Sequence, residues 1–313
     1  MKYRKLNEVL IEWNESSLED SDNTFLKSKD IKESFRYFVY KLDKKDQIKI
    51  FDADWGGEWP ELEKYRDKVL INDKHVELDE GWTVDEFEPG EYKVYIEDID
   101  KLTNTDSMFY KCEQLVSAFI PQGTNQVNSG QFIFGSCSNL KDVSIPSSII
   151  YLDDGVFFNC HHLTGVAIGD SVTSIGKSAF CGCYSLAGVT IPNSVTTIGY
   201  RAFEDCSRLT SVTIGDSVTS IGAFVFSRCT SLTSAVIGNS VTEIGRYAFD
   251  GCRRLASVAI GDSVTFIGHH AFSGCNKLKT IYVEDINKFN QIKIEDESAD
   301  PRHYGAKLIE LKK

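Results

Sequence analysis

The chain has 313 residues and a formal net charge of −12; 42% of its residues are hydrophobic and 26% are charged. The acidic excess lies in residues 1–105, which hold 27 acidic and 17 basic side chains. A negative chain without a basic stripe is a poor partner for phosphate groups, which argues against nucleic acid and against an anionic membrane surface. No apolar run approaches the roughly 18 residues that a membrane-spanning helix requires, so the sequence predicts no membrane insertion.

Residues 1–100 are predicted to form a small α+β or mostly β domain that also serves as the N-terminal cap of the array that follows. Apolar residues at helical spacing predict a helix over residues 5–13. Strands are predicted at residues 35–40, 47–51, 69–71, 75–78 and 91–96. A Lys-Lys-Asp turn separates the first two strands, and the turn Asn72-Asp73-Lys74 predicts a hairpin between the third and the fourth.

Two short stretches of this region bear on function. Residues 1–14 do not resemble a secretory signal, because the few apolar residues after the basic start are interrupted by acids. The loop of residues 52–60 contains three carboxylates and two tryptophans: Asp52, Asp54, Glu58, Trp55 and Trp59. These groups suit Ca²⁺ or a sugar, but a solvated acidic loop explains them more simply.

A 23-residue period organises the chain from about residue 109 to residue 283. A cysteine marks each period, with Phe three residues before it and Leu three residues after it. These cysteines are Cys137, Cys160, Cys183, Cys206, Cys229, Cys252 and Cys275. A fixed short period means that each unit buries its apolar face only by stacking on its neighbours. The sequence therefore predicts a solenoid of about eight repeats over residues 101–283.

The pattern within one unit predicts its local structure. The L-x-x-V-x-I segment, as at Leu209–Ile214, predicts a short strand, and a Gly-Asp or Gly-Asn turn follows it. The V-x-x-I-G segment then returns the chain along the other side. We expect one parallel strand ladder and a packed column of reduced cysteines, because a buried Cys behaves as a small hydrophobe. Cys181 stands outside that column and is expected to be the most accessible thiol, with Cys112 second.

The two ends of the array depart from the regular period. Residues 101–140 hold an irregular first repeat, in which Phe109, Cys112 and Leu115 match the pattern and two extra residues lie near residues 123–130. The period stops after Val283, and residues 284–313 are polar with scattered apolar residues. We predict that this last segment is a C-terminal cap over the final coil.

The unit L-x-x-V-x-I-(P/G)-(D/N)-S-V-x-x-I-G-x-x-A-F-x-x-C resembles the leucine-rich repeat of the BspA-like surface-protein family. The resemblance implies a leucine-rich-repeat solenoid and a non-enzymatic binding or adhesion role, with a protein or an extracellular matrix component as partner. It also implies a location at the cell surface or outside the cell. A fold does not determine a function, and residues 1–14 show no export signal. A structural or assembly component, in the cytoplasm or in a virus particle, is therefore the alternative.

We predict no enzyme activity, no cofactor and no metal site. The motifs G-x-S-x-G, P-loop, G-x-G-x-x-G and H-E-x-x-H do not occur; an activity without a motif in residues 1–100 is the third hypothesis. The pairs His161-His162 and His269-His270 lie more than four repeats apart, so they cannot share a metal, and each is expected to be a solvated pair. Cys181 lacks the further ligands that a zinc site requires.

Two outward surfaces are candidates for partner binding. On one, aromatic and basic residues precede the core Phe in neighbouring units, which is the composition of binding hot spots. The candidate residues of this strip are Tyr200, Arg201, Phe224, Arg246 and Tyr247. Phe224 is expected to face water, and an exposed aromatic residue suggests a binding role. Random variation at outward positions would also produce such a strip. The rival surface is the flat Thr/Ser face of the strands, with outward positions such as Thr213 and Ala259. Thr and Ser at these positions would also be found there simply because they favour pairing between strands.

Overall fold

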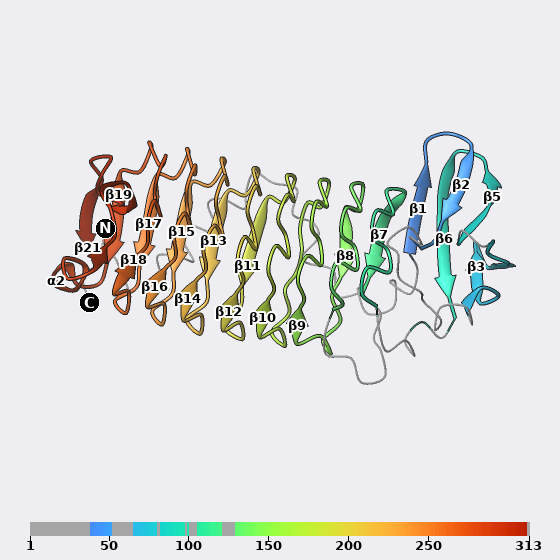
Figure 1. The fold of residues 1–313 in the computed structure, drawn as a ribbon, viewed down its shortest axis with the longest axis horizontal. Coiled ribbons are helices and arrows are strands. Elements are labelled where there is room, and N and C mark those ends of the chain that lie inside the picture. The colour runs from blue at the N-terminus through green and yellow to red at the C-terminus, as the bar shows by residue number, and fades with distance from the viewer. Residues whose placement is uncertain are drawn as a thin grey trace.

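The computed structural model describes residues 38–51, 65–79, 82–97, 99, 105–120 and 129–311. This part of the chain is a long row of stacked coils, and an antiparallel sheet lies against the first coils (Figure 1). The predicted leucine-rich-repeat solenoid is confirmed. The helix predicted for residues 5–13 and the acidic loop of residues 52–60 lie outside the described residues.

The described part of the N-terminal region is all β, in two sheets. Its strands are β1 (Phe38–Leu42), β2 (Asp46–Lys49), β3 (Val69–Ile71), β4 (Lys74–Val76), β5 (Thr83–Phe87) and β6 (Gly90–Ile96). β1 and β2 flank the predicted turn but do not pair with each other. β1 pairs antiparallel with β6, whereas β2 pairs with β5 in a separate two-stranded sheet. The sequence analysis missed β5, because T-V-D-E-F has too few apolar residues to show a clear alternation.

The predicted hairpin between residues 69–71 and 75–78 is confirmed. β3 pairs antiparallel with β4, and the pairing begins at Ile71 and Lys74 on either side of a two-residue turn. Asn72 and Asp73 have φ angles of 48° and 64°. Two successive positive φ values are the geometry of a type I′ turn, which favours Asn and Asp because their side chains tolerate that conformation.

The N-terminal sheet continues into the first coils of the array. Its strand order is β4-β3-β6-β1-β7-β8, where β7 (Leu115–Phe119) and β8 (Asp142–Ser144) belong to the first repeats. β1 pairs antiparallel with β7, and β7 pairs parallel with β8. The rings of Phe38 and Phe51 lie 4.5 and 5.5 Å from the ring of Phe109. The N-terminal region therefore covers the apolar end of the first coil.

The L-x-x-V-x-I segments form the expected parallel ladder along one face of the later coils. Its strands are β11 (Gly188–Ile191), β13 (Ser211–Ile214), β15 (Ser234–Ile237), β17 (Ser257–Ile260), β19 (Thr280–Val283) and β21 (Lys307–Glu310). Neighbours from β11 to β19 pair at a spacing of one period, as Val189 does with Val212, and β21, which follows the last repeat, pairs with β19 in the register Thr280↔Lys307. The repeat before β11 makes only one bridge, between Gly165 and Gly188. Glycine weakens a strand because it has no side chain to pack and loses more entropy on folding.

A second parallel ladder runs along the return side, so the expectation of a single ladder was wrong. Its strands are β9 (Tyr151–Leu152), β10 (Ser174–Ile175), β12 (Thr197–Ile198), β14 (Ser220–Ile221), β16 (Glu243–Ile244), β18 (Phe266–Ile267) and β20 (Lys293–Ile294). The threonine before several of these strands donates its hydroxyl to the carbonyl of the equivalent residue one coil earlier, as Thr242 does to Thr219 at 3.1 Å. Because the return segments from β10 to β18 have the same phase, they align as well as the strands of the first ladder do, and β20 joins them in the register Ile267↔Ile294.

The third side of each coil is hydrogen-bonded to its neighbour without being a strand. N–H groups of alternate residues donate to the next coil, as Arg201 does to Ala223 at 3.1 Å and Phe203 does to Val225 at 2.9 Å. Two residues per coil have positive φ, for instance Arg201 at 58° and Asp205 at 61°. This backbone turns the chain tightly while its polar groups stay paired, as buried or crowded backbone requires.

The interior holds two parallel columns, one of Phe and one of Cys. Successive Phe rings are fully buried and stacked, with centroids 5.0 Å apart between Phe180 and Phe203 and 5.9 Å apart between Phe134 and Phe157. Each column thiol donates to the carbonyl of the core Phe one coil earlier, as Cys252 does to Phe226 at 3.1 Å. All nine cysteines are free, and all except Cys181 are buried. The predicted buried column is confirmed, whereas the expected accessibility of Cys112 is wrong, because Ile50 and its neighbours cover it.

Residues after Val283 extend both ladders at the C-terminal end. The helix α2 (Ile286–Phe289) is followed by β20, the 3₁₀ turn η5 (Glu297–Ala299) and β21. β20 pairs with β18 on the return side, and β21 pairs with β19 on the strand side. Phe289 and Ala299 are buried against the last regular coil.

Candidate functional site

The tight loop before each core Phe presents two outward columns of side chains. The first column, three residues before the Phe, contains Lys177, Tyr200, Ala223, Arg246 and His269. The second column, two residues before the Phe, contains Ser178, Arg201, Phe224, Tyr247 and His270, all with φ between 53° and 60°. Because the backbone conformation repeats, equivalent side chains leave successive coils in the same direction and lie next to one another.

Four of the five candidate residues form one contiguous cluster, which we call the aromatic ladder: Tyr200, Arg201, Phe224 and Tyr247. The rings of Tyr200 and Phe224 lie 5.7 Å apart edge to face, and those of Phe224 and Tyr247 are stacked at 4.7 Å. The Arg201 guanidinium lies over both Tyr200 and Phe224, at 4.9 and 5.3 Å from the ring centroids. Such cation–π and ring contacts each contribute about 0.5–1 kcal/mol at exposed sites. The fifth candidate, Arg246, is exposed and occupies the Tyr200 position two coils further on.

Phe224 does not face water as the sequence analysis expected. It is half-buried, because Arg201 and Tyr247 cover its two sides. Tyr200 is the exposed ring of the ladder, with 41% of its surface accessible. The aromatic ladder is therefore a preformed surface of stacked rings.

A groove of about 480 Å³ runs beside the aromatic ladder. Its walls combine aromatic rings, charged groups and one thiol: Phe158, Tyr184, Phe224, Tyr247, Arg201, Arg228, Glu204, Asp205, Asp250 and Cys181. Arg201 pairs with Glu204 at 3.2 Å, and Arg228 pairs with Asp205 at 3.6 Å. The groove thus offers apolar walls with charges of both signs.

Burial changes the pKa of two groups in this groove, Glu204 and Cys181. Burial raises the pKa of the Glu204 carboxyl, and the Arg201 guanidinium opposes that rise. Burial, together with the charges of Glu204 and Asp205, raises the pKa of the Cys181 thiol to about 11. A thiol with a raised pKa carries little thiolate at neutral pH, and the thiolate is the reactive form. The Cys181 thiol is therefore a weak nucleophile at neutral pH.

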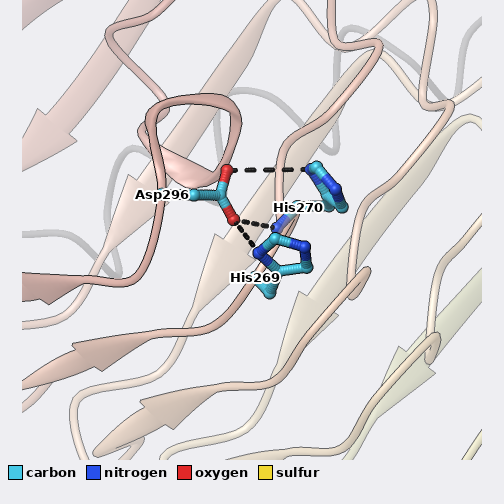
Figure 2. A group of neighbouring side chains, drawn as sticks. All are labelled: His269, His270 and Asp296. Atoms are coloured by element: carbon cyan, nitrogen blue, oxygen red, sulfur yellow. Dashed lines mark hydrogen bonds and ion pairs between the residues drawn. The ribbon is translucent and has the colours of Figure 1, made fainter.

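The two histidine pairs differ in their surroundings. His161 stacks on Tyr184 at 4.8 Å, and His162 Nδ1 lies 2.7 Å from the Ser138 carbonyl oxygen. His269 and His270 are not the solvated pair that the sequence predicted, because both face the carboxylate of Asp296 (Figure 2). Within the described residues, these three side chains are the group whose donor atoms could hold a metal ion, with all donors within 4.8 Å of one another.

The rival strand face is smaller than the sequence suggested. Thr190 is exposed and Thr213 half-buried, as expected for outward positions. Ala259, however, is only 8% exposed, because Leu311 from the C-terminal segment packs on it together with Val236 and Tyr282. The outward Thr and Ser positions of the first ladder therefore offer a flat surface mainly over its N-terminal strands. In the described part of the chain, no helix is long and apolar enough to cross a membrane.

Comparison with known proteins matches the array. The family model described as the BspA type leucine rich repeat region matches residues 100–187 and 173–296, with six copies of the repeat. A leucine-rich repeat protein from Bacteroides ovatus is 25% identical, over 64% of this chain and 56% of that chain, with a TM-score of 0.53. A leucine-rich cell surface protein from Faecalibacterium prausnitzii is 26% identical, over 58% of this chain and 63% of that chain, with a TM-score of 0.42. The aligned regions thus span less than two thirds of either solved protein. Comparison with curated proteins found no match.

Proposed function

Because the chain belongs to the BspA-type leucine-rich repeat family, we propose that it is a non-enzymatic binding protein that docks a protein partner on the aromatic ladder. The partner is a protein or an extracellular matrix component, and the setting is the cell surface or the host interface. Leucine-rich repeat solenoids generally mediate protein interactions, which supports the class of function. The aromatic ladder supports the proposed location of the docking site.

The observation that carries the proposal is the stacked cluster of Tyr200, Arg201, Phe224 and Tyr247 beside the groove. Trp, Tyr and Arg are enriched in binding hot spots. Tyr and Trp supply a large contact area at a low cost in conformational entropy. Here the rings already stack on one another, and Arg201 is held over two of them. A partner would therefore meet an ordered surface, and preorganisation lowers the entropic cost of binding.

The charges of the groove favour a polypeptide partner over a nucleic acid. Arg201 and Arg228 are each paired with a carboxylate, so the groove has no net basic field. That arrangement disfavours phosphate backbones, whose binding depends on unpaired basic groups. A polypeptide surface with apolar side chains and charges of both signs matches the groove better, and the three coils of the ladder span about 10–15 Å at the usual spacing of a ladder.

A structural or assembly component is the second candidate, and the continuity of the N-terminal sheet favours it. β1 pairs with β7, so the N-terminal region and the array share one hydrogen-bonded sheet. A rigid connection of this kind would let an anchored N-terminal region present the array at a fixed angle. This candidate applies inside a cell or in a particle as well as at a surface.

The test is capture of partners by the full chain, compared between two variants. The first replaces Tyr200, Phe224 and Tyr247 by Ser. Ser is tolerated at the Phe224 and Tyr247 positions, because Ser178 occupies the equivalent position of an earlier coil at a φ of 53°, and Tyr200 is exposed. The second replaces Thr190 and Thr213 by Lys on the strand face. We expect the first variant to weaken binding of purified matrix proteins or of captured proteins at least about tenfold, since hot-spot truncations cost about 2 kcal/mol or more, and the second to bind like the wild type.

Both variants are first compared with the wild type by far-ultraviolet circular dichroism, so that a loss of binding is assigned to the surface and not to the fold. If only the strand-face variant loses binding, the strand face is the docking site and the proposal for the aromatic ladder fails. If neither variant loses binding, the partner docks elsewhere on the chain.

A further inference from the structure

The C-terminal segment places a carboxylate against the last outward histidines of the array. His269 and His270 precede the core Phe272 in the final regular coil, and Asp296 follows β20. β20 pairs parallel with β18 in the register Ile267↔Ile294. That register carries Asp296 alongside His269, so the cluster is a consequence of the ladder and not of a loose loop (Figure 2).

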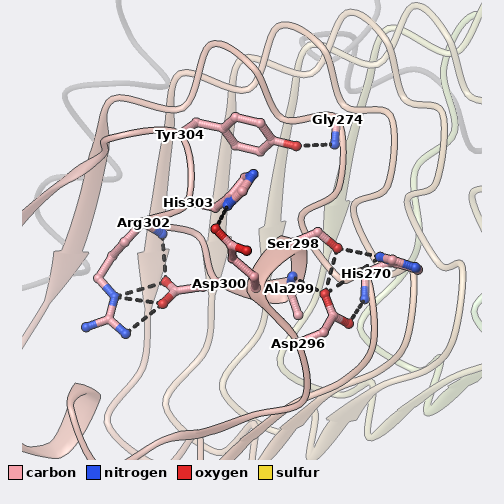
Figure 3. A network of polar contacts seen from close by, with 10 residues as sticks. His270, Gly274, Asp296, Ser298, Ala299, Asp300, Arg302, His303 and Tyr304 are labelled. Carbon is pink, nitrogen blue, oxygen red and sulfur yellow. Dashed lines mark hydrogen bonds and ion pairs between the residues drawn. The ribbon is translucent and has the colours of Figure 1, made fainter.

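The donor atoms of the three side chains converge. Asp296 Oδ2 lies 2.5 Å from His269 Nδ1, and Asp296 Oδ1 lies 3.7 Å from His270 Nδ1. The carboxylate is fixed by hydrogen bonds from its own segment and from the coil. The Ser298 hydroxyl donates at 2.6 Å, the Ala299 N–H at 3.0 Å and the His270 N–H at 2.8 Å (Figure 3). The Ser298 hydroxyl also contacts His270 Nδ1.

These bonds leave the carboxylate able to take a metal. An ionised carboxylate has about four acceptor positions. Three are filled by Ser298, Ala299 and the His270 N–H, and these bonds do not involve an imidazole. The fourth acceptor position, on Asp296 Oδ2, faces His269 Nδ1. A cation that takes the place of the proton between Oδ2 and this nitrogen therefore breaks none of the three hydrogen bonds that hold Asp296 in place.

The geometry requires only a small movement. Zinc binds His nitrogen at about 2.0–2.1 Å and carboxylate oxygen at about 2.0–2.2 Å, which separates two tetrahedral ligands by about 3.3 Å. The His269 ring must therefore move away from Asp296 Oδ2 by less than about 1 Å from its present 2.5 Å. The side chains of His269 and His270 are 48% and 36% exposed, so a water ligand can enter.

The local charge favours a cation. Residues 295–300 contain four carboxylates, Glu295, Asp296, Glu297 and Asp300. Arg302 pairs with Asp300 (Figure 3), and His303 pairs with Glu297.

We propose that His269, His270 and Asp296 form a zinc site that fastens the C-terminal segment to the last coil, with water as the fourth ligand. Each neutral imidazole binds through Nδ1 and keeps its proton on Nε2; for His270, the metal replaces the contact between Nδ1 and the Ser298 hydroxyl. Two nitrogen ligands select zinc-like transition metals over Mg²⁺ and Ca²⁺, which prefer oxygen. Because the ligands come from both the array and the closing segment, zinc binding stabilises their contact by mass action.

Calorimetric titration of the EDTA-treated full chain with ZnCl₂ tests the proposal. We expect one saturable site, a higher melting temperature with Zn²⁺ and no such shift with Mg²⁺ or Ca²⁺. Visible absorption of the Co²⁺-loaded chain should report tetrahedral coordination. Asp296→Asn is the informative variant, because Asn keeps the side-chain oxygen that caps η5 and loses the carboxylate. Its affinity should fall by more than the roughly 10–100-fold that outer-shell changes cost.

The chain supplies a matched control in its other histidine pair. Replacement of His161 and His162 by Gln should leave zinc affinity unchanged, whereas replacement of His269 and His270 by Gln should abolish it. Circular dichroism is compared for all variants before titration. The proposal is overturned if the wild type shows no saturable zinc binding, if Asp296→Asn binds as tightly as the wild type, or if the His161/His162 variant is the one that loses the site.

Discussion

Replacement of Phe226 by Ala is expected to lower the free energy of unfolding by about 3–5 kcal/mol, the usual cost of truncating a buried aromatic residue. Phe226 is fully buried, and its ring lies 5.5 Å from Phe203 and 5.3 Å from Phe249 in the two adjacent coils. Each stacked pair adds about 0.5–1.5 kcal/mol beyond the burial of area.

The surroundings of Phe226 place the effect in the upper half of that range. Its N–H donates to the Ala248 carbonyl at 2.8 Å, and its own carbonyl accepts the Cys252 thiol at 3.1 Å. These bonds hold the coils at a constant spacing, so the neighbours cannot collapse into the space that the ring leaves. A cavity that does not collapse costs more than one that does.

Urea unfolding followed by circular dichroism measures the change. In a solenoid, stability is approximately a sum of repeat and interface terms, so a weakened interface in the middle of the array uncouples its two halves. We therefore expect a lower midpoint together with a broader transition, since less surface unfolds in one step.

Thr219→Ala is the matched control for this substitution. Thr219 lies in the same coil as Phe226, but its side chain is exposed on the return side. Its replacement should change the free energy of unfolding by less than about 0.5 kcal/mol. Equal losses for the two variants, or a loss below about 1 kcal/mol for Phe226→Ala, would refute the assignment of the Phe column to the core.

The remaining predictions concern the coil spacing and the thiols. A methyl group on Gly245 would lie 2.7 Å from the Ile221 carbonyl oxygen of the preceding coil, whereas one on Gly169 would meet nothing within 4 Å. Gly245→Ala should therefore destabilise by about 1–3 kcal/mol and Gly169→Ala by less than about 0.5 kcal/mol in the same unfolding assay, and a reversed order would contradict the observed stacking. Iodoacetamide should modify Cys181 before any other thiol of the native chain, and early modification of Cys112 would contradict its burial. Because the pKa of Cys181 is raised to about 11, its rate of modification should increase about tenfold per pH unit up to that value; a rate that levels off near pH 9 would contradict the raised pKa.

The sequence alone determined the solenoid and its interior. Each core residue recurs with one phase, so the partner of Phe203 in the next coil is the residue one period later, Phe226. The period therefore predicts which residues of neighbouring coils contact one another, and it predicts the buried Cys column for the same reason. The hairpin at Asn72 and Asp73 was predictable too, because turn chemistry depends on adjacent residues only.

The sequence also indicated which residues share the aromatic ladder, but not how they contact one another. Membership of a column follows from the period, which placed Phe224 and Tyr247 one coil apart. The half-burial of Phe224 depends on the rotamers of Arg201 and Tyr247 in neighbouring coils, and no periodicity encodes those.

Only the tertiary structure decided the contacts between segments that do not repeat. β1 pairs with β7, Leu311 covers Ala259, and Asp296 reaches His269. In each case one partner lies outside the period, so no phase relates the two residues. Their pairing is set by where a terminal segment docks on the end of the array, and that docking depends on apolar burial and ladder hydrogen bonds summed over many residues.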